Sequence, residues 1–186
     1  MILHIKHMVS LRCIMMVKSE LDKLHLSYSS VELGSVNLIK DIVPDEQKNL
    51  AKNLSLSGLE IIEDKKSILV EKVKTLIIEM VHYNEELPYI NYSEYISKKL
   101  GYDYGYLANI FSEEKGITIQ HFIIKHKIEK VKELLNYDEL TLTEISYQLK
   151  YSSVGHLSYQ FKKTTGISPS NYRDQKKNIR IKLEDL

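Results

Sequence analysis

The residue types best suited to binding a metal or reacting with an oxidant lie close together near the amino terminus. Cys13 is the only cysteine of the 186-residue chain, and His7 lies shortly before it. A thiolate and an imidazole both bind ions such as Cu(I) or Zn(II). A cysteine at the start of a helix can also have a lowered pKa and be sensitive to oxidation. With one cysteine no internal disulfide can form, and we expect the chain to work in a reducing cytoplasm.

The other titratable side chains show no pattern that predicts catalysis. The remaining histidines lack metal-ligand spacing, and the sequence contains no nucleophile–base set, phosphate-binding loop or dinucleotide-binding glycine motif. We therefore expect no enzymatic activity and no bound cofactor. No apolar run approaches the roughly 18 residues that cross a membrane. Charged side chains among the first residues argue against a secretory signal.

The net charge of +1 excludes a uniformly basic protein, but the charge is unevenly distributed. Residues 140–183 contain eight basic and two acidic side chains, a local excess of six positive charges. Such a patch attracts a polyanion whatever the total charge of the chain. The sequence therefore predicts a cationic surface near the carboxyl end.

Residues 1–63 alternate between strand and helix patterns. Strands are expected at residues 2–8, 28–33, 35–39 and 59–63, and helices at residues 13–24 and 44–56. Gly34 separates the second and third strands, and Pro44 suits the first turn of the second helix. The resulting βαββαβ order predicts a ferredoxin-like domain.

After residue 63 the apolar spacing is helical throughout, which predicts an α+β chain. We expect an amino-terminal domain at residues 1–66, an all-α double helix-turn-helix domain at residues 67–177 and a tail at residues 178–186. Asn91 with Glu94 and Thr141 with Glu144 have the spacing of capping boxes that begin helices.

Residues 91–123 and 141–173 resemble each other. Most equivalent positions are 50 residues apart: Leu107, Phe111, Gly116, Ile117 and Phe122 correspond to Leu157, Phe161, Gly166, Ile167 and Tyr172. Each copy indicates a short helix, a tight turn and a second helix that ends at glycine. The sequence thus predicts two helix-turn-helix units, joined by a helix over about residues 118–136.

The second copy resembles the carboxy-terminal signature of the AraC/XylS transcription regulators. The matching residues are Glu144-Ile145-Ser146, Leu149, Tyr151 through Leu157, Phe161-Lys162-Lys163, Gly166-Ile167-Ser168-Pro169-Ser170 and Tyr172-Arg173. The resemblance extends over roughly residues 68–175. It implies a bacterial DNA-binding domain whose two recognition helices enter successive major grooves. The expected partners are double-stranded DNA and the transcription machinery.

The resemblance also implies which residues face DNA. The groove-facing candidates are Tyr104, Gly105, Ala108 and Asn109 in the first copy and Val154, Gly155, Ser158 and Tyr159 in the second, with Ser153 and Lys162 at the flanks. Phosphate contacts are expected from Lys162, Lys163, Arg173, Lys176 and Lys177.

The strongest base contacts are those of arginine with guanine and of glutamine with adenine. None of the groove-facing candidates is an arginine or a glutamine. Asn109 is the one candidate that could pair with adenine in the same way. Asp103, Glu113 and Glu114 in the first copy would be repelled by phosphate. We therefore expect phosphate anchoring mainly through the second unit, with modest base discrimination.

The amino-terminal domain resembles heavy-metal-associated domains, whose first loop reads Met-x-Cys-x-x-Cys. In this chain Met8 and Cys13 are present, but Ser10 occupies the position of the first cysteine. A neutral hydroxyl is a poor ligand for a soft ion. We therefore expect a fold that has lost its metal, with Cys13 and His7 as the remaining candidate ligands for Cu(I) or Zn(II).

Two alternatives to plain DNA binding remain open at this stage. The chain could be a metal- or redox-responsive sensor that acts through Cys13. It could also be a helix-turn-helix scaffold for protein interaction, since its base-reading positions are weak.

Overall fold

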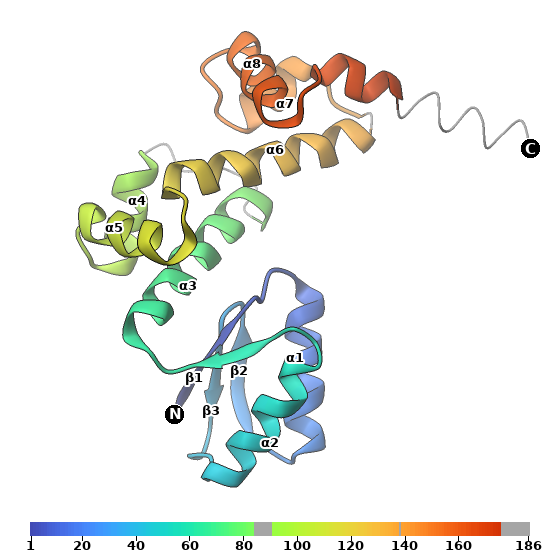
Figure 1. The fold of residues 1–186 in the computed structure, drawn as a ribbon. Helices are drawn as coiled ribbons and strands as arrows, with labels where there is room; N and C mark the ends of the chain where they lie inside the picture. Colours follow the sequence, from blue (N-terminus) through green and yellow to red (C-terminus); the bar gives the residue numbers. More distant parts are fainter. Residues whose placement is uncertain (84–90, 138, 176–186) are drawn as a thin grey trace, which may run out of the picture. The chain divides into compact units, whose positions relative to one another are not determined.

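The computed structural model describes residues 1–83, 91–137 and 139–175 (Figure 1). It begins with the expected βαββαβ order. The elements are β1 (Ile2–Lys6), α1 (Leu11–Lys23), β2 (Tyr28–Glu32), β3 (Ser35–Leu38), α2 (Pro44–Ser55) and β4 (Glu60–Ile62). The strands form one antiparallel sheet in the order β2-β3-β1-β4.

One face of this sheet packs on α1 and α2, which lie side by side (Figure 1). Alternate residues of the strands point to this face because side chains in a strand change sides at every residue. The buried cluster consists of Leu3, Ile5, Met8, Val17, Leu21, Val31, Val36, Leu38, Leu50, Leu54 and Leu59. Gly34 closes the β2–β3 turn at a φ of +82°, and a Cβ there would lie 2.9 Å from Thr75 Oγ1.

The rest of the described chain is helical, so the α+β class is confirmed. The elements are α3 (Lys65–Ile78), the π-helical turn η1 (Glu79–Tyr83), α4 (Tyr92–Leu100), α5 (Tyr104–Lys115), α6 (Ile119–Tyr137), α7 (Leu142–Gln148) and α8 (Val154–Thr165). A last helix begins at residue 169. Helix α3 starts two residues earlier than expected, because Asp64 accepts a hydrogen bond from the Ser67 N–H at 2.8 Å.

The chain forms two compact units. The first comprises Met1–Ile78 and Tyr92–Gly116, and the second comprises the described residues of Glu79–Asn91 and Ile117–Leu186. In the first unit α3 packs against α4 and α5, and in the second α6 packs against η1, α7 and α8. Each unit therefore contains one helix-turn-helix. The domain limits at residues 66 and 177 remain a prediction.

Candidate nucleic-acid interface

Helices α5 and α8, the second helices of the two helix-turn-helix units, begin with the same local structure. Asp103 accepts a hydrogen bond from the Tyr106 N–H at 3.1 Å, and Ser153 accepts one from the His156 N–H at 3.0 Å. Capping of this kind satisfies an amide that has no partner inside the helix. The capping hydrogen bond therefore fixes the first turn of each helix in the same way.

The two helices also end alike. Gly116 and Gly166 have φ values of +67° and +85°, and their N–H groups donate to Ser112 and Lys162 carbonyls at 2.9 and 2.8 Å. The left-handed backbone conformation at this position is adopted most easily by glycine. Each helix therefore has 12 residues, and the 50-residue repeat predicted from the sequence is confirmed in three dimensions.

The inner faces of both helices are core, as expected. Leu107 and Phe111 in α5, and Leu157 and Phe161 in α8, are fully buried. The groove-facing candidates occupy positions i, i+1, i+4 and i+5 of each helix, which lie on one side. Among them Gly105, Asn109, Gly155 and Tyr159 are exposed, while Tyr104, Ala108, Val154 and Ser158 are half-buried. The cap Ser153 is exposed beside them.

Two of the predicted phosphate ligands are exposed in the last turn of α8. Lys162 and Lys163 lie one turn beyond Ser158 and Tyr159. The Lys163 ammonium lies 6.0 Å from the centre of the Tyr159 ring, within reach of a cation–π attraction. This places a cation beside the exposed aromatic ring of α8.

Arg173 has a contact that the sequence did not indicate. Its Nη2 donates to the Leu140 carbonyl at 2.7 Å, and the side chain is half-buried. The guanidinium therefore joins the last described helix to Leu140, the residue before the N-cap of α7. Lys176 and Lys177, the other two predicted phosphate ligands, lie outside the described residues.

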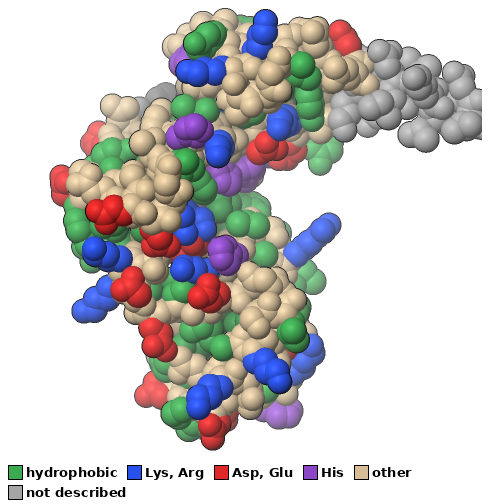
Figure 2. Space-filling model, viewed as in Figure 1, with side chains coloured by type: hydrophobic (Ala, Val, Ile, Leu, Met, Phe, Trp, Pro, Cys, Tyr) green, Lys and Arg blue, Asp and Glu red, His purple; other side chains and the backbone are tan. Residues whose placement is uncertain are grey.

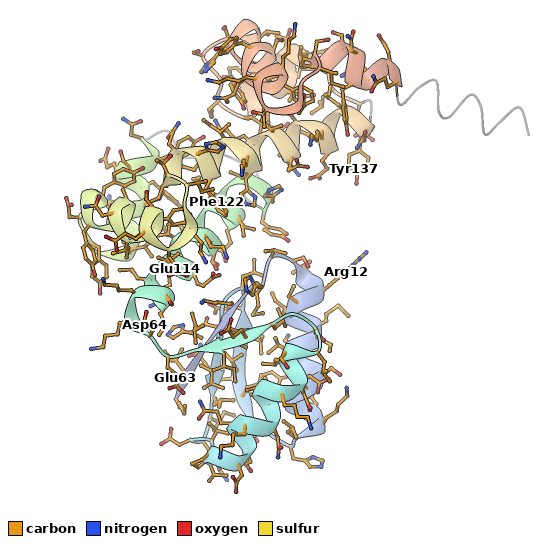
Figure 3. The ribbon with its side chains drawn as sticks, in the orientation of Figure 1. Arg12, Glu63, Asp64, Glu114, Phe122 and Tyr137 are labelled. Carbon is orange, nitrogen blue, oxygen red and sulfur yellow. The ribbon has the colours of Figure 1, made fainter. Side chains whose placement is uncertain are left out.

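The acidic end of α5 is held by lysines of its own unit. Glu114 lies 3.8 Å from the Lys6 ammonium of β1 and 2.9 Å from that of Lys115 (Figure 3). Buried Glu71 of α3 also accepts from Lys115, at 3.4 Å, and from Lys74, at 2.7 Å. Figure 2 shows acidic and basic side chains intermingled around these helices. Glu114 is thus neutralised within the unit, which reduces the phosphate repulsion predicted for it.

In both units, a side chain of the helix-turn-helix turn contacts a side chain in the first turn of the following helix. This contact was not predicted from the sequence. The Tyr102 and Tyr106 rings stack with centroids 6.0 Å apart. Fifty residues later, the Ser152 hydroxyl lies 2.9 Å from His156 Nδ1. The repeat spacing relates these two pairs and could have revealed them.

A second missed feature lies on α6. Lys127 is buried, and its ammonium lies 4.7 Å from the centre of the Tyr151 ring. Burial disfavours the charged form and lowers the pKa of Lys127 to about 8. In the turn of the second unit, Lys150 has a φ of +52°. This is a left-handed backbone conformation, which glycine adopts without the strain that a Cβ causes.

The amino-terminal loop brings the backbone of His7 toward Cys13. The thiol lies 4.0 Å from the His7 carbonyl oxygen and 3.6 Å from the Ser10 hydroxyl. Burial opposes ionisation, but hydrogen bonds from the Val9 and Ser10 backbone and the Ser10 side chain outweigh it and lower the pKa of Cys13. Within residues 1–83, 91–137 and 139–175, no three potential metal ligands form a group. Metal binding at Cys13 and His7 stays a prediction.

Residues 96–175 match the family described as a helix-turn-helix domain. Over 103 residues the chain is 31% identical to YtdP of Bacillus subtilis (strain 168), an uncharacterized HTH-type transcriptional regulator. That match covers 55% of this chain and 13% of YtdP. YdiP of Escherichia coli (strain K12), described in the same words, is 33% identical over 93 residues, which cover 50% of this chain and 31% of YdiP. The chain thus spans less than a third of either relative.

A solved structure gives the same result. The C-terminal domain of AraT, a response regulator from Geobacillus stearothermophilus, is 29% identical to this chain with a TM-score of 0.50. The alignment covers 60% of this chain and 88% of that domain. In the described ranges, no helix is long and apolar enough to cross a membrane. Residues 96–175 therefore match the helix-turn-helix domain family, and the helical part of the chain is similar in fold to the AraT domain.

Proposed function

We propose that this chain binds double-stranded DNA and thereby regulates bacterial transcription. The observation that carries the proposal is the pair of equally capped helices, α5 and α8, each with an outer face free of core residues. Such a helix fits the major groove, where it reads base edges. The names of YtdP and YdiP as HTH-type transcriptional regulators support the proposal. Each helix enters one of two successive major grooves.

The two units contribute unequally to DNA affinity. Helix α8 has Lys162 and Lys163 in its exposed last turn, where α5 has Ser112 and Glu113 at the equivalent positions. Lysines that contact phosphate release counterions and supply affinity that depends on salt but not on sequence. The second unit therefore anchors the complex, and the first unit adds base contacts.

This mode of action involves no covalent chemistry, so the chain acts without being an enzyme and without a cofactor. Its site of action is the bacterial cytoplasm, where the DNA lies. The transcription machinery is its second partner, recruited or blocked by the protein on its operator.

The experiment is a fluorescence anisotropy titration of duplex DNA at several salt concentrations. Lys162→Gln with Lys163→Gln should weaken binding and make the slope of log K against log salt shallower by about two. The matched control is Lys48→Gln with Lys52→Gln, which removes the same charge from exposed positions of α2. Equal effects of the two double variants, or no salt-dependent duplex binding by the unaltered chain, would contradict the proposal.

A further inference from the structure

We infer that the outer faces of α5 and α8 select A·T base pairs, so that the operator is rich in A·T where the two helices contact it. This inference rests on the proposed function and specifies its ligand. It depends on which side chains the structure exposes on those faces and on the base edges that such side chains can recognise.

On α5 the decisive residue is Asn109. Its side chain is exposed, and within the part of the chain that the structure describes its amide has no hydrogen-bond partner. A carboxamide can donate to N7 and accept from N6 of the same adenine, and this bidentate contact is possible with no other base. Ala108, half-buried beside it, offers a methyl group to the C5-methyl of thymine. Both residues favour the same kind of base pair.

On α8 the outer face is apolar, and it has no side chain at Gly155, the second residue of the helix. A Cβ built on Gly155 would have only Ser153 Oγ within 4 Å, at 3.8 Å, so the glycine leaves the backbone open to a base edge. Val154 precedes it, and Tyr159, 66% exposed, lies one turn further on. An isopropyl group and an aromatic ring next to this opening suit the thymine methyl group, which projects into the major groove.

Neither face offers a guanidinium or ammonium at a groove position, and these are the groups that pair with O6 and N7 of guanine. On α8 the cations Lys162 and Lys163 lie in the last turn, where the Lys163 ammonium is next to the Tyr159 ring, and on α5 Lys115 is the last residue and pairs with Glu114. His156 also lies near the start of α8, but its Nδ1 is paired with Ser152. Recognition of G·C pairs therefore lacks its usual donors on both helices.

The first experiment selects binding sequences from a random duplex library with the unaltered chain. Enriched sequences should contain two A·T-rich segments. Deoxyuridine in place of thymine in an enriched duplex removes only the methyl group. It should weaken binding about fourfold for each contacted methyl, from the transfer free energy of one carbon. Tyr159→Ala should reduce this sensitivity to deoxyuridine.

The second experiment tests the adenine contact. Asn109→Ala should weaken binding to the enriched duplex by about tenfold, as expected for a lost bidentate contact. It should also abolish the effect of 7-deazaadenine, which lacks N7. Alanine favours helix, so the fold should persist. Asn136→Ala, at an exposed position of α6, is the matched control and should bind like the unaltered chain.

The outcomes separate this inference from the proposed function. If the chain binds duplex DNA but enriches G·C-rich or random sequences, the inference is wrong and the function stands. Equal affinity for thymine and deoxyuridine duplexes also overturns it. If the chain binds no duplex, the proposed function itself fails.

Discussion

His82 Nε2 lies 3.1 Å from His126 Nδ1, which joins the π-helical turn η1 to helix α6 within the second unit. The two rings meet edge to face, with centroids 5.3 Å apart, and Phe122 packs on His126 from the same helix (Figure 3). One imidazole must donate and the other accept, so the bond requires at least one neutral ring. The pair therefore links the packing of this unit to pH.

Burial lowers the pKa of His82, and Lys130 lowers it further, while Glu133 and Glu129 oppose the shift. The folded state thus prefers neutral His82. The stability that neutral His82 contributes is complete at pH values above its pKa in the unfolded state, about 6.5. It is lost as the pH falls through the lower pKa that His82 has in the folded state. We expect the free energy of unfolding to decrease between pH 7 and pH 5.

Denaturant unfolding at a series of pH values checks this prediction. His82→Gln should lower stability at pH 7 by about 1 kcal/mol, the usual net value of a hydrogen bond, and should flatten the acid dependence. His121→Gln, which alters an exposed histidine of α6, should leave the acid dependence unchanged. A pH profile of His82→Gln identical to that of the unaltered chain would show that this pair is not responsible.

Ser153→Asp should separate helix capping from DNA binding. Aspartate caps α5 at the equivalent position, Asp103, so it should cap α8 and keep the unfolding free energy within about 0.5 kcal/mol. Its carboxylate, however, would face phosphate and weaken duplex binding. Ser153→Ala should instead cost about 1 kcal/mol of stability.

The two readouts for this position are thermal unfolding and duplex titration at low salt. Ser170→Ala, at an exposed serine without a capping bond in the described structure, controls for loss of a hydroxyl. A Ser153→Asp variant that binds duplex DNA as tightly as the unaltered chain would place this cap away from the phosphates.

Replacing each of the two glycines of the α8 region by alanine should change the stability of the protein in opposite directions. Gly166 has a φ of +85°, so Gly166→Ala should destabilise the protein by about 1 kcal/mol even though no atom lies within 4 Å of the new Cβ. Gly155 is helical and open, so Gly155→Ala should stabilise it by about 0.5 kcal/mol through helix propensity. Denaturant midpoints measure both changes, and a shift in the same direction would contradict the assignment of strain to Gly166.

Ser10→Cys should create metal affinity in the amino-terminal domain. The Ser10 hydroxyl lies 3.6 Å from the Cys13 sulfur, so a cysteine there would bring two thiolates close enough to share a Cu(I) ion. Under reducing conditions we expect tight Cu(I) uptake by Ser10→Cys and equally weak uptake by the unaltered chain and Cys13→Ala. Competition with a chromogenic chelator measures each affinity. Tight, Cys13-dependent uptake by the unaltered chain would support the metal-sensor alternative instead.

The sequence by itself determined the element order, the repeat and some of the helix ends. The capping box of Thr141 and Glu144 is present, with hydrogen bonds of 2.7 and 3.2 Å. The linker helix predicted over residues 118–136 is α6, Ile119–Tyr137. These features depend on neighbours within one or two turns, because periodicity and capping are local properties of the backbone.

Only the tertiary structure decided which distant residues meet. Arg173, a predicted phosphate ligand, also donates to the Leu140 carbonyl, and Glu114, predicted to repel phosphate, lies 3.8 Å from the Lys6 ammonium. Lys127 of the linker helix is buried, with its ammonium 4.7 Å from the centre of the Tyr151 ring, which its place in the sequence does not indicate. A charged side chain has the same sequence signature whether it faces water, a carbonyl or an opposite charge. Its partner is chosen by the packing of elements that lie far apart in the chain, which no local pattern records.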